Sequence, residues 1–152
     1  MKKGKLLVVA LLAGSLFTAC SSSSDRLAHK WVVTYASYLP GTPPDPADTT
    51  VDSTRQLYQD AYQGCKYDIH QDGTFATDGI DGKRSGKWKE SDGVVVLTYS
   101  DNNKTETWEF PEHEGIKIYG DSSLEPNLLL GGGDKLELIL KPQHGEKVKT
   151  DY

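Results

Sequence analysis

Apolar and polar side chains alternate with a period of two along most of the chain after residue 30. Tyr67 and Ile69 alternate with charged neighbours, and so do Leu136, Leu138 and Leu140. Such alternation indicates antiparallel strands with one dry and one wet face. Turn-forming residues separate nine expected strands, at 31–37, 65–70, 74–77, 84–90, 94–100, 104–110, 115–119, 127–130 and 135–141.

The stretch 38–64 breaks this alternation. Prolines recur across residues 40–46, and proline cannot donate to a strand ladder. Residues 52–63 then predict a short helix, with Asp52 or Ser53 as cap and Gly64 as stop. Long irregular segments are uncommon unless functional, so this segment is either a lid over a barrel mouth or an ordered plug covering core. The predicted fold class is all-β: a small antiparallel up-and-down barrel of about eight strands, with one short helix after the first strand.

Loop lengths decide which side chains share the inner face, because a one-residue slip turns a strand over. A three-residue loop ending at Gly73 places Phe75 opposite Ile69. A two-residue turn at 92–93 pairs Trp88 with Leu97, and one at 102–103 pairs Leu97 with Trp108. The side chains expected inside the barrel, as candidate ligand contacts, are Trp31, Val33, Tyr35, Tyr67, Ile69, Phe75, Trp88, Leu97, Tyr99, Trp108 and Phe110.

The first 24 residues have a different composition from the rest. Three lysines open the chain, and a charge-free run from Leu6 to Phe17 follows. That run is shorter than the ~20 residues that cross a bilayer as a helix, which is typical of a signal peptide. It ends in Thr18-Ala19-Cys20, followed by four serines.

This ending resembles the lipobox of bacterial lipoproteins. The resemblance implies that the Cys20 thiol receives a diacylglycerol, that the chain is cut before Cys20, and that the new amino terminus is acylated, with acyl chains such as palmitate. Several acyl chains give stable membrane attachment. In that family an aspartate after the cysteine favours the inner membrane, so Ser21 favours the outer membrane of a Gram-negative bacterium. The alternatives are an ordinary secretory signal cut after Ala19 and an uncleaved amphipathic anchor.

The expected organisation is a signal peptide at 1–19, a lipidated cysteine and serine-rich tether at 20–27, one barrel domain at 28–142 and a polar tail at 143–152. The chain has 17 basic and 22 acidic residues, and three of the lysines lie in the signal peptide. The mature protein is therefore acidic, and nucleic acid is an unfavourable partner. With Cys20 lipidated, Cys65 lacks a disulfide partner and is interpreted as a small buried side chain.

Several short motifs together resemble the lipocalin-like domains of bacterial surface lipoproteins. They are the tryptophan at the start of the first strand, the Cys-x-Tyr-x-Ile hairpin from Cys65 with its Asp-Gly-Thr-Phe turn, Gly86-Lys87-Trp88, and the Leu-x-Leu-x-Leu final strand. The resemblance implies a barrel that binds a small apolar or amphipathic molecule. An eight-strand barrel can instead be filled by its own side chains.

Catalysis has little support in the sequence. Asp68 and His70 share an outward face, and Asp72 is a turn former. The four histidines are scattered, so no zinc spacing occurs, and we expect neither a metal nor a cofactor. Thr49 and Ser53 each follow an aspartate, in a pattern that resembles the O-glycosylation sequons of one group of Gram-negative bacteria.

Two classes of function stay open. The first is a lipid-tethered binding module whose barrel holds a small apolar or amphipathic ligand. The second is a structural or interaction lipoprotein with a packed core that contacts an envelope partner or polysaccharide. The volume of the barrel interior distinguishes the two classes, because only the first requires a cavity. The sequence determines neither this volume nor the oligomeric state.

Overall fold

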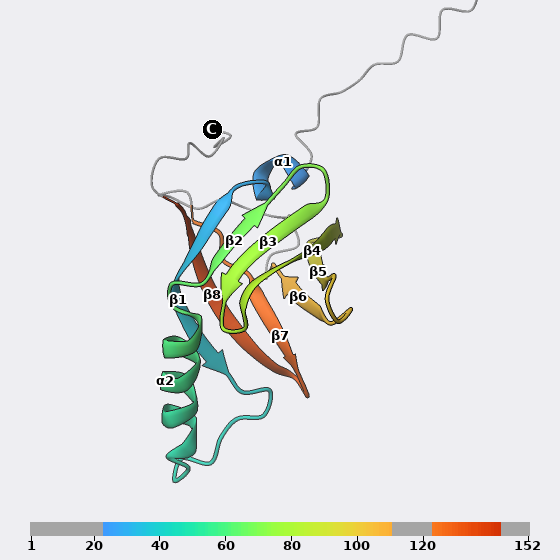
Figure 1. Ribbon diagram of the computed structural model, residues 1–152. Coiled ribbons are helices and arrows are strands. Elements are labelled where there is room, and N and C mark those ends of the chain that lie inside the picture. The colour runs from blue at the N-terminus through green and yellow to red at the C-terminus, as the bar shows by residue number, and fades with distance from the viewer. Residues whose placement is uncertain (1–22, 111–122, 144–152) are drawn as a thin grey trace, which may run out of the picture.

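The computed structural model describes residues 23–110 and 123–143. Eight antiparallel strands follow one another in chain order and close into a barrel through pairing of β1 with β8 (Figure 1). The predicted up-and-down barrel with one short helix after the first strand is therefore confirmed. The elements are α1 Ser23–Leu27, β1 Lys30–Leu39, α2 Thr50–Tyr62, β2 Lys66–Ile69, β3 Thr74–Gly79, β4 Gly82–Ser91, β5 Val94–Tyr99, β6 Thr105–Glu109, β7 Asn127–Gly131 and β8 Asp134–Pro142.

The candidate strand at 115–119 lies outside the described residues, as do Cys20, the signal peptide and most of the polar tail. Across the described ranges, no helix has the length and apolar character needed to cross a bilayer.

Two of the predicted turns are confirmed. Ile69 pairs with Phe75 around a three-residue loop, and Gly73 takes the left-handed conformation there, with φ of 83°. Trp88 pairs with Leu97 around the two-residue turn at 92–93, where both residues have positive φ. A turn of that kind matches the twist of the strands that it joins.

The turn between β5 and β6 differs from the prediction. Four residues, 100–103, form the loop, so Leu97 lies opposite Glu106 and Val95 opposite Trp108. The physical reason is local, because the Asn102 side chain accepts a hydrogen bond from the Lys104 amide at 3.0 Å, and Asn103 takes a left-handed φ of 55°. The register moves by two residues, which leaves the alternation of β6 unchanged, so Trp108 and Glu106 both face inward.

Strand β1 carries a bulge that overturns one predicted orientation. The pairing with β8 shifts between Val33 and Tyr35, so the residue that follows Val33 on the inner face is Ala36. Tyr35 therefore points outward and is 43% exposed. A bulge adds one residue to a strand and reverses the alternation beyond it, which a strict period of two does not anticipate.

Helix α2 lies along β1, on the side of the barrel (Figure 1). It begins at Thr50 with Thr49 as its cap residue, two positions before the predicted start, and the chain turns away at Gly64, where φ is 86°. The Gln59 side chain accepts a hydrogen bond from the Ala36 amide at 2.9 Å, and the Tyr58 ring stacks on that of Tyr38. The helix thus packs against β1 and the core through the partly buried rings of Tyr58 and Tyr62, and none of its own residues is fully buried.

Helix α1 closes one end of the barrel. Leu27 is fully buried, and its carbonyl accepts a hydrogen bond from the Trp31 indole at 2.8 Å. Asp25 also accepts a hydrogen bond from Gln71 in the loop between β2 and β3. The tether expected to run to Leu27 therefore gives way to helix from Ser23 onward, and Leu27 belongs to the core.

Candidate functional site

The eleven side chains predicted to line the barrel interior divide into three groups. Tyr35 faces outward, and Phe110 lies just beyond β6 and is partly buried. Tyr67 and Tyr99 line a pocket. The other seven are buried and pack together in the core, namely Trp31, Val33, Ile69, Phe75, Trp88, Leu97 and Trp108. Most of the aromatic inner face is thus packed core, whereas the sequence left open whether it lines a cavity.

The pocket has a volume of about 270 Å³ and opens at the end of the barrel away from α1. Its rim is formed by the β3–β4 turn, by the start of β6 and by the last residues of β7, and Tyr62 of α2 contributes a further wall. Strand β3 runs from the α1 end at Thr74 to this rim at Gly79 (Figure 1). The barrel is therefore filled at one end and hollow at the other.

A carboxylate, Glu106, lies where the packed core meets the pocket. Its Oε1 accepts hydrogen bonds from the Tyr67 hydroxyl at 2.8 Å and from the Trp108 indole at 2.7 Å. Its Oε2 accepts one from the Tyr99 hydroxyl at 2.8 Å. Three neutral donors on three strands thus fix the position of one charged group.

The two tyrosines that hold Glu106 remain neutral donors. Burial, followed by the nearby charge of Glu106, raises the pKa of Tyr67 and that of Tyr99 well above the ordinary value. Burial likewise raises the pKa of Tyr62. The hydroxyl groups of Tyr67 and Tyr99 therefore stay protonated, and continue to donate to the Glu106 carboxylate, at every physiological pH.

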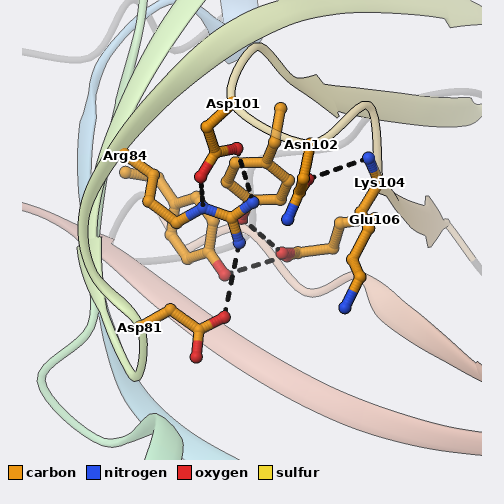
Figure 2. A network of polar contacts seen from close by, with 8 residues as sticks. Asp81, Arg84, Asp101, Asn102, Lys104 and Glu106 are labelled. Atoms are coloured by element: carbon orange, nitrogen blue, oxygen red, sulfur yellow. Dashed lines mark hydrogen bonds and ion pairs between the residues drawn. The ribbon is translucent and has the colours of Figure 1, made fainter.

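Arg84 forms the wall of the pocket above Tyr99, with its guanidinium 3.8 Å from the ring centroid. Two of its nitrogens donate to the Asp101 carboxylate at 3.0 and 2.8 Å, and a third donates to Asp81 at 3.3 Å (Figure 2). The fork of parallel bonds to Asp101 is the strongest geometry for such a pair. It lowers the pKa of Asp101 and holds Arg84 against the ring.

The arrangement suits binding. A carboxylate offers about four acceptor positions, and three are used by Tyr67, Tyr99 and Trp108, which leaves one on Oε2. The remaining walls include Leu128 and Leu130. A ligand with a hydrogen-bond donor at one end and an apolar body fits this combination.

A larger hollow of about 500 Å³ lies on the outer face of β1 to β4. Its walls include Lys30, Lys66, Asp78 and Lys83, all of which are exposed. Mixed exposed charges facing water give little selectivity, because solvent screens them. This surface is therefore a weaker candidate than the pocket at Glu106.

Asp68, His70 and Thr74 form a chain of contacts on the outer surface. His70 lies 3.2 Å from Asp68 and 2.8 Å from the Thr74 hydroxyl. That hydroxyl donates its own proton to Asp72 at 2.6 Å, so His70 cannot serve as the base that removes it. Nowhere in 23–110 or 123–143 do three or more His, Cys, Asp or Glu side chains gather as they would to hold a metal ion.

Glu106 and Arg84 were missed by the sequence reasoning. Both carried a detectable signal, since Glu106 lies two positions from the buried Trp108 and Arg84 two positions from the buried Gly86. A charged side chain at an inward position of a strand is unusual enough to mark a candidate site. The incorrect β5–β6 register placed Trp108 opposite Leu97, where the structure has Glu106.

No family model and no curated protein matches this chain. Among solved structures, the chain is similar to the crystal structure of a DUF4847 family protein from Bacteroides vulgatus ATCC 8482, with a TM-score of 0.45 and 13% sequence identity. The similarity covers 78% of this chain and 96% of that chain. The strand pairing of the protein itself shows the barrel fold.

Proposed function

We propose that this protein is a bacterial lipoprotein of the cell envelope that binds a small molecule in the pocket at the open end of its barrel. The observation that carries the binding function is Glu106, a carboxylate placed inside a β-barrel at a pocket and held by three neutral donors. Placing a charge inside a barrel costs free energy unless it is compensated, so it is a sign of function. The ligand is small, because the pocket volume of about 270 Å³ lies just below the usual range for ligand sites.

The anchor in this proposal is the lipidated Cys20, and the sequence pattern before it supports that assignment. Cys20 lies three positions before α1, which sets a reach of at most ~11 Å for an extended chain. The closed end of the barrel then faces the outer membrane, and the pocket opens away from it. A pocket in that position takes its ligand from the surrounding solution and not from the lipid layer.

Native mass spectrometry of the protein purified from its host tests the binding function. We expect a co-purifying small molecule that is lost in Glu106→Gln and retained in Glu109→Gln, because Glu109 lies on the same strand but pairs with Lys135 at 3.0 Å outside the pocket. An empty pocket in the unsubstituted protein would favour the second class of function, an interaction lipoprotein. The packed half of the barrel is the observation that favours that alternative.

Intact mass measurement tests the anchor separately. We expect a chain that begins at Cys20 and carries the added mass of a diacylglycerol and an acyl group, and a Cys20→Ser variant that stays in the soluble fraction. A mass equal to the bare peptide from Cys20, or to the uncleaved chain from Met1, would reject lipidation.

A further inference from the structure

We propose that the ligand of the pocket is an organic cation, a small molecule whose protonated amine approaches the carboxylate of Glu106. This inference rests on the proposed function and specifies its ligand. It differs from the apolar ligand that the resemblance to lipocalin-like domains implied.

The first support is the charge of Glu106. Its hydrogen-bond partners Tyr67, Tyr99 and Trp108 are neutral, and no Lys, Arg or His of the described ranges forms an ion pair with it. Neutral donors orient a carboxylate without cancelling its charge, and Glu106 is partly buried, so water compensates that charge less than at an exposed position. A cationic ligand supplies the pairing that the described residues do not.

The second support is Arg84, the cation of the pocket wall. Its guanidinium is turned toward Asp101 and Asp81 (Figure 2). It also lies on the face of the Tyr99 ring. The single positive charge of Arg84 is therefore paired with two carboxylates, and its side chain is only 12% exposed. The guanidinium is consequently engaged at the rim, where it does not neutralise Glu106.

The third support is the free acceptor position on Oε2. An ammonium group carries only donors, so it complements a carboxylate directly, whereas an anionic ligand would meet like charge at the same point. The other cations at the pocket, Lys66 and Lys104, are exposed at its rim, where solvent screens them. Selection by charge is therefore strongest at Glu106.

The fourth support is the composition of the walls. Tyr62 of α2 and Tyr67 of β2 line the space, and aromatic rings attract cations, whereas the face of Tyr99 is already occupied by Arg84. Leu128 and Leu130 provide an aliphatic surface for the body of the ligand. The walls thus fit an amine attached to a compact apolar group.

The experiment compares three probes of nearly equal shape: benzylamine, benzyl alcohol and benzoate. Each is titrated into the full mature chain, residues 20–152, which carries Cys20→Ser so that it stays in solution. The readout is the indole N–H resonances of the three tryptophans. The Trp108 indole donates to Glu106, whereas those of Trp31 and Trp88 donate to the Leu27 and His70 carbonyls. We expect a saturable shift at Trp108 alone, with benzylamine at least ten-fold tighter than benzyl alcohol and benzoate weakest.

Two variants locate the charge that is responsible. Glu106→Gln should abolish the preference for the amine, while Glu109→Gln should keep it. The Trp31 and Trp88 resonances report whether each variant is folded. If Glu106→Gln fails to fold, the salt dependence of the unsubstituted protein takes its place: benzylamine binding should weaken between low and high salt, and benzyl alcohol binding should not.

The possible outcomes separate the inference from the proposed function. Equal binding of amine and alcohol, or tighter binding of benzoate, would overturn the organic cation and leave a binding pocket. Absence of a saturable shift with all three probes would overturn the cation as well. The binding function itself would be overturned if none of the probes gave a saturable shift and native mass spectrometry also found the pocket empty.

Discussion

Asp134 fixes the start of the proline-rich segment to the barrel. One of its carboxylate oxygens accepts a hydrogen bond from the Tyr38 hydroxyl at 2.8 Å, and the other accepts one from the Gly41 amide at 2.9 Å. The bond from Gly41, and next that from Tyr38, lower the pKa of Asp134 below its ordinary value of 3.8. The charged form is therefore the one that holds the segment.

This pKa shift predicts a loss of stability in acid. Because the folded pKa lies below the unfolded one, Asp134 contributes stability above about pH 4, and this contribution disappears as the pH falls through the folded pKa. Urea unfolding from pH 7 to pH 3 should show a difference between the unsubstituted protein and Asp134→Asn that shrinks below pH 4. Tyr38→Phe removes one of the two hydrogen bonds and should raise the pKa of Asp134 in a carbon NMR titration. A difference that stays constant down to pH 3 would contradict this account.

Gly86 of β4 has no room for a side chain. A Cβ added there would overlap the Thr98 carbonyl oxygen of β5 and would lie 2.8 Å from the Phe75 ring. The Thr98 carbonyl cannot move without disturbing β5, so only glycine, which has no Cβ, fits at position 86.

Gly86→Ala should therefore destabilise the fold by about 1–3 kcal/mol or more, the usual cost of overpacking a core. Chemical denaturation measures this loss in the free energy of unfolding. Ser85→Ala, the neighbouring position on the outer face, is the matched control and should change stability by less than about 0.5 kcal/mol. A Gly86→Ala protein as stable as this control would show that β4 and β5 can separate locally.

At the scale of elements, α2 takes the place of a neighbouring strand for part of β1. Strand β2 pairs with β1 only over Lys30–Val32. The next amide of β1, that of Val33, donates a hydrogen bond to the Cys65 carbonyl, just before β2 begins. Beyond that point the Ala36 amide donates to the Gln59 side chain. A helix side chain thus satisfies a strand donor that would otherwise lack a partner in the sheet.

Gln59→Ala should release the Ala36 amide and increase its hydrogen exchange rate by at least ten-fold. It should also lower the free energy of unfolding by about 1–3 kcal/mol, the cost of leaving such a donor unsatisfied. Gln56→Ala is the control, because Gln56 is an exposed residue of the same helix that contacts Asp60. Unchanged protection at Ala36 would mean that water replaces Gln59 without loss.

At the scale of the whole molecule, the packed core and the pocket occupy opposite ends of one barrel. Leu27 and Trp31 lie at the closed end, and Glu106 faces the open one. The proposed lipid anchor precedes α1 and therefore belongs to the closed end. In the proposed arrangement, one end of the molecule faces the membrane and the other faces the solution, and the length of β3, about 20 Å, separates them.

Fluorescence quenching in liposomes tests this orientation. In a Cys65→Ala background, a fluorophore on Gln71→Cys, in the loop beside α1, should be quenched by nitroxide lipid head groups. The same fluorophore on Ile80→Cys, in the exposed turn at the pocket rim, should be quenched several-fold less. Equal quenching at both positions would reject an upright barrel.

Local sequence patterns determined the class of the fold and much of its register. Period-two alternation is a short-range signal, and so is the left-handed glycine at position 73, so each could be identified from a few residues. The same holds for Gly64 at the end of α2. The rules failed at Tyr35 and at the β5–β6 loop, because a bulge and a four-residue turn give no clear signal in alternation alone.

Only the tertiary structure decided where the barrel is hollow. Glu106 meets Tyr67 from β2, Tyr99 from β5 and Trp108 from its own strand, and closure of the barrel brings these strands around one carboxylate. Whether an aromatic face fills the interior depends on the summed volumes of side chains from all eight strands, which alternation in a single strand does not contain. The sequence by itself thus determined a barrel, and the fold determined the pocket.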